Sequence, residues 1–405
     1  MKKTAVLSAI AASLAFAAFA DSPAAPKTGF ARDALQKFVD SGQLPGAVNV
    51  FFDNGREEIA CLGYADARTK RPVTLDDPFM QCSQTKGFCG VTVAILVEEG
   101  RLKLDDPVSK YLPEFKTLWV ESFDRKTGAR TLRKAKNTLT VRMVMNHTGG
   151  FPFELPNFER MGGWSRRMPL RSVAACAAAF PLRFEPGTKM QYSNVGIDIG
   201  AAVVEAVTGK RWEDFLQERV LDPLGMKDTC FRPSDAAISR RIEMAQCRKN
   251  APAKRILCHP SMQAPFGDDR VFPSAGAGLW TTARDQLKFY KMLMNLGVGE
   301  NGRRILKEET VKSILAVSTR PKGLGGYSLG LTAPEADGED CWFGHGGAWG
   351  TNCSVNWHKK QLKLWVVQLT GGPRPWDAER EKAEKAFFGQ KIDNSGAKAY
   401  TGRMK

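Results

Sequence analysis

The sequence predicts a mixed α/β (α+β) fold in which both ends of the chain build one antiparallel sheet. Three observations lead to this prediction. Alternating apolar residues fold back at Asn54-Gly55, a pair that is typical of two-residue hairpin turns. From Leu102 to Asp269 the sequence shows helical periodicity and long loops, and after Gly325 short apolar strands return. We therefore expect flanking helices, an inserted and mostly helical subdomain, and a cleft between the two parts.

The N-terminal elements follow from local patterns. A helix is expected over 31–42, where apolar residues recur at helical spacing and a glycine ends the pattern. Residues 47–65 supply the two strands of the hairpin. The next helix is expected to begin close to Ser83 and to end at Gly100, because this stretch has an apolar stripe and no proline.

Later elements are marked by caps and by alternation. Thr140 is expected to cap a short helix, and Thr282 with Asp285 has the pattern of a capping box. Further helices are expected over 171–180, 194–209, 211–220, 281–297 and 375–390, and strands over 327–332, 341–347, 351–358 and 362–370. The expected units are a signal peptide (1–20), a sheet subdomain (21–66 plus 270–392), a helical subdomain (67–269) and a flexible tail (393–405).

The first twenty residues differ in composition from the rest. Two lysines precede an Ala-rich apolar run that ends in AFA, which is typical of a bacterial Sec-type signal peptide cleaved after Ala20. A retained membrane anchor is the alternative, and the shortness of the run disfavours it. No later segment reaches about 18 unbroken apolar residues. We expect a periplasmic or secreted protein with no membrane anchor after cleavage.

The formal net charge of +16 is compatible with an anionic partner. Much of the excess lies in two polar segments, 125–142 and 239–255. Neither segment interleaves aromatic with basic residues, as a groove for nucleic acid would. Both are therefore predicted to be solvated loops, and no nucleic-acid partner is expected.

Nine cysteines are many for an exported chain, and an odd number leaves at least one thiol unpaired. Oxidising surroundings favour disulfides. Cys247 with Cys258, which bracket a polar loop, form the best candidate pair. Cys341 and Cys353 form a second candidate across neighbouring strands. Cys82 and Cys89 are predicted to pack as small apolar residues.

Ser83 and Lys86 form a Ser-x-x-Lys motif. At this spacing both side chains lie on one face of a helix. A serine in the first turn keeps a free backbone N–H, and the lysine can handle the hydroxyl proton that a nucleophile must lose. The motif alone is weak, because a second copy, Ser395 to Lys398, lies in the polar tail. Two polar residues one turn apart are the alternative.

Two further motifs carry candidate polar groups. Tyr192 and Asn194 form Tyr-x-Asn on a loop before a helix, where tyrosine can shuttle protons and asparagine can bind an amide or a lysine. Closure of that loop by hydrogen bonds is the alternative. His345 and Gly347 form His-x-Gly among the C-terminal strands, and the backbone N–H that follows is a candidate oxyanion donor beside that of Ser83. A simple turn between strands is the alternative here.

Together these motifs resemble the serine β-lactamase and penicillin-binding-protein superfamily, in its class C-like branch of D-aminopeptidases and carboxylesterases. The segments VRMVMNHTGGF, FEPGTKMQYSNVG, VTGKRWEDFLQERVLDPLGMKDTCF and SAGAGLWTTARDQLKFYKMLMNLG also match family stretches. The resemblance extends over residues 31–370 and implies a β-lactamase/transpeptidase-like fold.

The resemblance implies roles for the motif residues. Ser83 would be the acylated nucleophile and Lys86 its assistant. Tyr192 would deprotonate Ser83 and protonate the leaving group, and Asn194 would orient the substrate or Lys86. The N–H groups of Ser83 and Ala348 would form the oxyanion hole, beside Gly347 and His345. His147 would be structural. No metal or organic cofactor is implied.

The third motif departs from the class C pattern, because His345 stands where those β-lactamases have the lysine of Lys-Thr-Gly. A histidine is largely neutral near pH 7 at its ordinary pKa and should bind a β-lactam carboxylate weakly. The resemblance therefore favours an exported esterase or D-amino-acid peptidase acting on a small-molecule, peptide or ester substrate, cell-wall material included. A β-lactamase and a non-catalytic penicillin-binding sensor are the alternatives. Specificity is expected from residues 151–169 and 230–269.

Overall fold

The computed structural model describes residues 29–156, 168–256 and 272–389. Its centre is a six-stranded sheet in the order β10-β11-β12-β1-β2-β3. Strand β1 pairs with β2 on one side and with β12 on the other, where Val48 lies opposite Val366. All neighbours within this sheet are antiparallel. The prediction that both chain ends build one antiparallel sheet is therefore confirmed. The strands are β1 (Gly46–Asp53), β2 (Arg56–Asp66), β3 (Arg71–Pro72), β10 (Phe343–Gly346), β11 (Asn352–Asn356) and β12 (Gln361–Val366).

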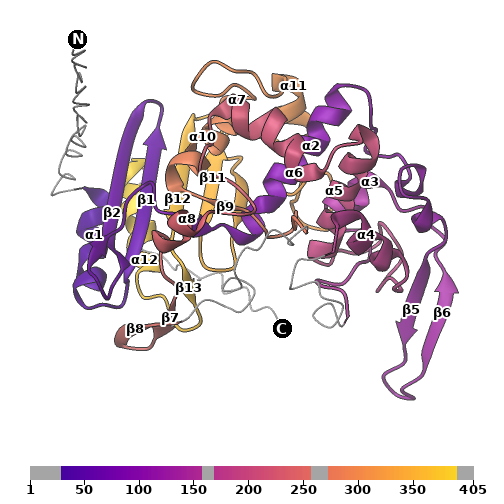
Figure 1. Cartoon of the computed structure of the whole chain (residues 1–405), viewed down its shortest axis with the longest axis horizontal. Helices are drawn as coiled ribbons and strands as arrows, with labels where there is room; N and C mark the ends of the chain where they lie inside the picture. The colour runs from indigo at the N-terminus through magenta and orange to yellow at the C-terminus, as the bar shows by residue number, and fades with distance from the viewer. Residues whose placement is uncertain (1–28, 157–167, 257–271, 390–405) are drawn as a thin grey trace, which may run out of the picture.

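The hairpin between β1 and β2 turns where the sequence predicts it. Asn54 and Gly55 both have positive φ, 45° and 95°, as the favoured two-residue turn requires. Alternation then sends the side chains of β1 to two different cores. Phe51 packs with helices α1 (Phe30–Asp40) and α12 (Asp377–Phe387), whereas Val50 faces the larger core on the other side. The terminal helices thus cover one face of the sheet (Figure 1).

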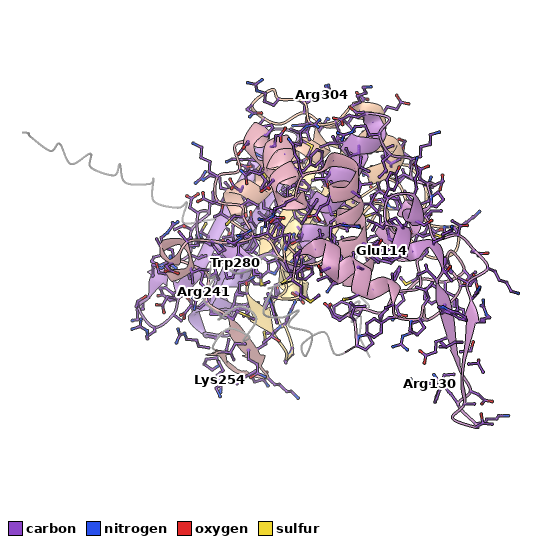
Figure 2. The ribbon with its side chains drawn as sticks, turned by 45° about the vertical axis from the view of Figure 1, so that its right-hand side comes forward. Glu114, Arg130, Arg241, Lys254, Trp280 and Arg304 are labelled. Atoms are coloured by element: carbon purple, nitrogen blue, oxygen red, sulfur yellow. The ribbon has the colours of Figure 1, made fainter. Side chains whose placement is uncertain are left out.

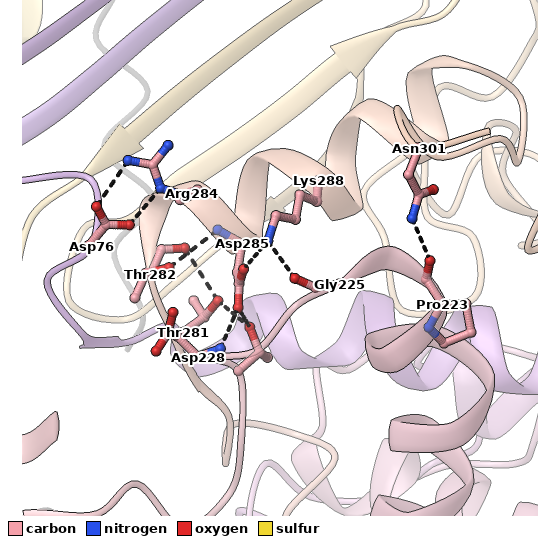
Figure 3. Close-up of polar contacts among 11 residues, drawn as sticks. Asp76, Pro223, Gly225, Asp228, Thr281, Thr282, Arg284, Asp285, Lys288 and Asn301 are labelled. Carbon is pink, nitrogen blue, oxygen red and sulfur yellow. Dashed lines mark hydrogen bonds and ion pairs between the residues drawn. The ribbon is translucent and has the colours of Figure 1, made fainter. Parts of the chain in front are cut away.

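Helix α10 (Ala283–Met294) packs on the opposite face, against β11 and β12. Its N-terminus also holds the helical part of the chain in place (Figure 3). Thr282 accepts from the Asp285 N–H as the helix cap, at 3.2 Å, and the Asp285 carboxylate accepts from the Asp228 N–H at 2.8 Å. Arg284 makes a two-pronged ion pair with Asp76. These contacts fix the N-terminus of α10 to the segment after α7 (Asp222–Leu224) and to the loop before β4 (Phe79–Met80), the strand that pairs with β9 (Trp280–Thr281).

The middle of the chain is mostly helical, as predicted, and is arranged around α2 (Thr85–Glu98). Nearly every side chain of α2 is buried, because α5, α6 and η5 pack against it together with the sheet. The other helices are η1 (Cys82–Gln84), η2 (Val108–Lys110), η3 (Pro113–Lys116), α3 (Val141–Met145), α4 (Leu170–Ala178), α5 (Asn194–Thr208), α6 (Trp212–Leu216), η4 (Gln217–Leu221), α7 (Asp222–Leu224), α8 (Asp235–Ser239), α11 (Glu308–Thr310) and η5 (Val311–Leu315).

The two basic segments are not simple loops, which corrects the sequence prediction. One contributes β6 (Arg130–Lys134), which pairs with β5 (Trp119–Phe123). The other forms the hairpin of β7 (Ala245–Arg248) and β8 (Ala251–Arg255). Strand β7 also pairs in parallel with β13 (Leu369–Thr370) from the C-terminal part. The residues of β6 and most of those of β8 are exposed, so these two strands lack the apolar alternation by which a half-buried strand is recognised, whereas β7 does alternate but is only four residues long.

The segment 327–332 is likewise not a strand, although its apolar alternation predicts one. It makes only isolated bridges, from Thr332 to Tyr327 and Gly344. Gly330 has a φ of 75°, and a Cβ there would lie 2.1 Å from the Lys86 carbonyl oxygen. A Cβ on Gly90 would similarly lie 1.7 Å from the Leu329 carbonyl oxygen. Glycines on both sides therefore let this segment lie directly on α2.

The predicted disulfide between Cys341 and Cys353 is absent, and both are free thiols. Cys353 lies opposite His345, whereas Cys341 precedes β10 and contacts the Ala336 carbonyl instead. The pairing of Cys247 with Cys258 falls outside the described residues, as do the signal segment 1–20 and the tail 393–405. Within the described ranges, no helix is long and apolar enough to cross a membrane.

Candidate active site

Ser83 lies in η1, in the turn that leads into α2, and its side chain is half-buried. The preceding residue, Cys82, has a φ of 51°, a left-handed conformation that side chains other than glycine seldom adopt. Such strain concentrates at functional sites, where the surrounding structure maintains it. The N–H of Ser83 donates to no acceptor among the described residues, so it is free to bind a substrate oxygen.

Lys86 is fully buried and contacts the side chain of Ser83. Its Nζ lies 3.2 Å from Ser83 Oγ, 2.6 Å from Asn194 Oδ1 and 2.6 Å from the Gly276 carbonyl oxygen. The two shorter contacts are to groups that only accept, so two N–H bonds of Lys86 must point to them. The third position on Lys86 Nζ faces the Ser83 hydroxyl, which can accept a hydrogen bond from an ammonium or donate one to a neutral amine. Lys86 can therefore hold the Ser83 proton without any change in its other contacts.

Asn194 begins α5 and links Lys86 to a partly buried carboxylate. Its Nδ2 donates to Glu154 Oε1 at 2.6 Å while its Oδ1 accepts from Lys86. Because an ionised carboxylate can only accept, Glu154 determines which end of the amide faces the lysine. Burial raises the pKa of Glu154, and the hydrogen bond from Asn194 opposes that shift.

A second carboxylate, which is buried, supports the other acceptor of Lys86. Asp198, one turn along α5, accepts from the Gly276 N–H at 3.1 Å, and the carbonyl of Gly276 contacts Lys86. Burial, followed by the charge of Glu154, raises the pKa of Asp198 to about 7. Close packing also matters at this point, because a Cβ on Gly276 would lie 2.7 Å from Asn194 Cβ.

Tyr192 is brought to the same site. Lys86 Nζ lies over its ring, 4.6 Å from the centroid, which is a cation–π contact. The ring also stacks on Phe153 and contacts His147, at centroid distances of 6.1 and 4.5 Å. Its hydroxyl is 3.5 Å from His345 Nε2, at the outer limit of a hydrogen bond. In this structure the hydroxyl faces the histidine, and Lys86 is the proton-handling side chain in contact with Ser83 Oγ.

His345 lies on β10 and is almost fully buried. Its Nδ1 is 2.6 Å from the Gly346 carbonyl, which can only accept, so Nδ1 carries the proton and Nε2 has a lone pair. The hydroxyl of Tyr327 donates to that lone pair at 3.0 Å. Burial, followed by the charge of Lys86, lowers the pKa of His345 to about 3. The group in the third motif is therefore neutral.

His147 lies between two aromatic rings and away from the nucleophile's hydrogen bonds. The rings of Tyr192 and Tyr327 are each 4.5 Å from it. Its Nδ1 accepts from the Ser193 N–H at 3.3 Å, and burial lowers its pKa well below the ordinary value. These contacts position both tyrosines relative to His345.

The backbone after His345 approaches the turn that carries Ser83. Gly347 donates to the Thr351 carbonyl at 2.7 Å, and a Cβ on it would lie 2.5 Å from the Gln81 carbonyl oxygen. The next residue, Ala348, is exposed, and its N–H has no acceptor among the described residues. Trp349 packs against the small cluster that contains Cys82. Two unpaired N–H groups, those of Ser83 and Ala348, thus come from segments in close contact.

The structure assembles all seven residues that the sequence singles out, and it adds Tyr327, Glu154, Asp198 and Gly276. Tyr327 was missed because its segment has the apolar alternation of a strand. Glu154 and Asp198 lie among apolar residues, and a lone acid in such a stretch is the only signal that could have identified them. Among the described residues, no group of three or more His, Cys, Asp or Glu is placed to hold a metal ion.

Known proteins are similar to this chain in sequence and in fold. A family model described as Beta-lactamase matches residues 31–388. Protein Rv1367c of Mycobacterium tuberculosis is 30% identical over 289 residues, which cover 69% of each chain. A mutant of simvastatin synthase (LovD) from Aspergillus terreus has a TM-score of 0.71 at 23% identity, covering 89% of this chain and 94% of that one. EstCE1, described as a hydrolase with promiscuous acyltransferase activity, has a TM-score of 0.69 at 21% identity, covering 88% and 97%.

Proposed function

The chain belongs to the Beta-lactamase family of serine hydrolases, and on that premise we propose that it is an exported esterase that acts through an acyl-enzyme on Ser83. The observation that carries the proposal is the contact of Ser83 Oγ with the buried Lys86 Nζ at 3.2 Å. A serine hydroxyl needs such a neighbour, because it is too weakly acidic to attack a carbonyl unaided.

The proposed acylation begins with attack of Ser83 Oγ on the ester carbonyl carbon. The hydroxyl proton passes to Lys86, and the carbonyl oxygen, now negatively charged, is bound by the N–H groups of Ser83 and Ala348. Collapse of this intermediate breaks the bond to the alkoxide, which takes a proton relayed from Lys86 by Tyr192. Water then attacks the acyl-enzyme by the same route, releases the carboxylic acid and restores the serine.

The choice of an uncharged ester rests on the neutral aromatic side of the site. His345 carries no charge near pH 7, because its pKa is lowered to about 3. It therefore cannot bind a substrate carboxylate as a charged lysine would. Phe153, 44% exposed, stacks on Tyr192 and offers apolar surface to an acyl or alkyl group. Both features disfavour β-lactam hydrolysis and the penicillin-binding alternative.

Hydrolysis of D-aminoacyl amides is the second candidate. Glu154 favours it, because this acidic side chain is joined to Lys86 through Asn194 and could balance the charge of a substrate amine. Against this candidate, the Glu154 carboxylate already accepts a hydrogen bond from Asn194 within the protein, and its raised pKa disfavours its charged form. The ester therefore remains our first choice.

The test is intact-mass analysis after brief exposure to a fluorophosphonate probe, with peptide mapping of the adduct. We expect one adduct, on Ser83, and none on the Ser83→Ala variant. Turnover of p-nitrophenyl esters, D-alanine p-nitroanilide and nitrocefin should then follow that order. Folded protein with no adduct would exclude an activated serine, and fast nitrocefin turnover would replace the esterase with a β-lactamase. The N-terminal residue of the exported protein tests the proposed cleavage after Ala20.

A further inference from the structure

The hairpin of β5 and β6 projects from the helical part of the molecule, far from the sheet (Figure 1). Its pairing runs from Trp119 opposite Lys134 to Phe123 opposite Arg130. Arg130 lies toward the outer end of the hairpin (Figure 2). All five residues of β6 are exposed, so this strand has no core to pack against.

The register places the large apolar side chains of the hairpin on one face. Side chains alternate along a strand, and directly paired residues share a face. Trp119 and Phe123 therefore lie on the same face as Leu132, which is opposite Glu121. These three side chains are 43%, 57% and 59% exposed, a large apolar surface to leave in water.

Positive charge surrounds this apolar face. Residues 119–136 contain six basic and two acidic side chains, a net charge of +4. Arg130 and Lys134 lie on the apolar face itself. Glu121 is already engaged by Arg130 and Arg183, so it does not cancel the remaining basic groups. Lys126 and Lys134 have no ion pair within the described part of the chain.

A cavity of about 350 Å³ lies at the base of the hairpin. Three lysines line it: Lys116 from η3, Lys134 at the end of β6, and Lys136 just after that strand. Lys134 belongs both to the cavity lining and to the apolar face, so the two adjoin at this residue. The combination offers a site for a phosphate group beside a surface for hydrocarbon.

We propose that the β5–β6 hairpin binds the surface of an anionic phospholipid bilayer. Aromatic and leucine side chains partition into the interface of a bilayer, and lysines and arginines bind its negative head groups. A soluble polyanion would satisfy the charges and leave Trp119, Phe123 and Leu132 in water. A second copy of the same hairpin would bring like charges together. This proposal is independent of the reaction at Ser83.

The molecule supplies a matched control in its other basic hairpin. The β7–β8 hairpin carries Lys249 and Lys254, both exposed and neither ion-paired within the described ranges. Its exposed residues include no large apolar side chain, and its Ala253 packs against the sheet core. In Figure 2 the labelled Lys254 marks the position of this hairpin, which lies well apart from the labelled Arg130. Binding driven by charge alone should use both hairpins equally.

The experiment is co-sedimentation of the full chain with vesicles of phosphatidylcholine, with and without 30% phosphatidylglycerol. We expect binding to the anionic vesicles only. Phe123→Ser with Leu132→Ser, and separately Lys126→Glu with Lys134→Glu, should each weaken that binding about tenfold or more. Lys249→Glu with Lys254→Glu should weaken it less than about twofold. Circular dichroism and thermal melting confirm that each variant is folded, as expected for exposed positions.

Three results would overturn the proposal. The wild-type protein could fail to bind anionic vesicles. The apolar variant could bind as the wild type does, which would leave charge as the only attraction. The two lysine pairs could have equal effects, which would remove any special role for this hairpin. Retention on heparin that is unchanged by the apolar variant, together with absent vesicle binding, would assign the surface to a soluble polyanion instead.

Discussion

The two sides of Ser83 are built from different chemistry. On one side, Lys86 is held by Asn194 and Gly276, and these in turn by the carboxylates of the partly buried Glu154 and the buried Asp198. On the other side, His345 is surrounded by the rings of Tyr192 and Tyr327, with His147 between them. The lysine side is ionic and hydrogen-bonded at short distances, whereas the histidine side is neutral and aromatic.

The difference separates two tasks that a hydrolase must perform. A proton-handling group needs fixed geometry, and each acceptor of Lys86 is itself held by a further hydrogen bond or by close packing. A substrate-binding wall needs only the right shape and polarity. In the proposed mechanism, a neutral His345 in place of a cation would change which substrates are accepted without disturbing Lys86, the group that would activate the serine.

Breaking the lysine side should have the largest effect. We expect Ser83→Ala to remove ester turnover and probe labelling, with a loss of about 10⁴-fold or more, and Lys86→Ala to approach that loss. Single-turnover acylation rates measure both, and thermal melting checks the fold. A Lys86→Ala enzyme that is acylated at the normal rate would show that another group takes the proton from Ser83.

Tyr192→Phe tests the group that contacts both sides. Loss of its hydroxyl should slow acylation by about 10²-fold, the usual effect of removing a general acid or base. The ring, and therefore its contact with Lys86, is retained. Pre-steady-state kinetics with an activated and a poor leaving group provide the measurement. If only the poor leaving group is affected, the hydroxyl acts on the leaving group rather than on the serine.

Glu154→Gln should produce about a tenfold loss. A glutamine can donate as well as accept, so Asn194 is no longer obliged to present its oxygen to Lys86. We expect kcat to fall with little change in KM, and the pH–rate profile to shift. Glu154→Asp, which keeps the acceptor, should retain more activity than glutamine. Equal losses for both variants would indicate a packing role instead.

His345→Lys sharpens the comparison by making the neutral side cationic. An added charge pair is worth up to about 1 kcal/mol when partly solvated, so KM for a carboxylate-bearing ester should fall about fivefold. KM for the matching uncharged ester should stay constant or rise. Steady-state kinetics on such a pair of esters give the ratio directly. An unchanged ratio would mean that substrate anions do not reach this position.

The two sides should also respond to pH in opposite directions. The pKa of Asp198 is raised to about 7, so its contribution to stability is complete below pH 4 and is lost as pH rises through 7. The pKa of His345 is lowered to about 3, so its contribution is complete above pH 6.5 and is lost as pH falls toward 3.

Two variants separate these contributions. Asp198→Asn should gain up to about 4 kcal/mol relative to wild type between pH 4 and pH 8, because a pKa shift of about three units is worth about 1.4 kcal/mol per unit. His345→Gln should gain a similar amount between pH 7 and pH 4. Denaturant unfolding at each pH measures both differences. Parallel stability–pH curves for wild type and variants would contradict the assignment of these groups.

Local sequence patterns determine much of this protein. The Asn54-Gly55 turn, the caps at Thr140 and Thr282 and the helical periods are short-range signals, and the structure has the elements that they predict. The three motifs likewise identify the residues that surround Ser83, because each motif requires particular residue types at a fixed spacing. The family resemblance predicts that the three motifs come together at one site.

Tertiary structure alone decided the rest, because it depends on contacts between distant segments. Glu154 and Asp198 stand out locally only as lone acids among apolar residues, and their roles depend on Asn194 and Gly276, which come from other parts of the chain. Tyr327 reaches His345 only because Gly90 and Gly330 let its segment lie against α2. The neutrality of His345 is also a tertiary property. A sequence specifies an imidazole, and its burial in the folded protein lowers the pKa.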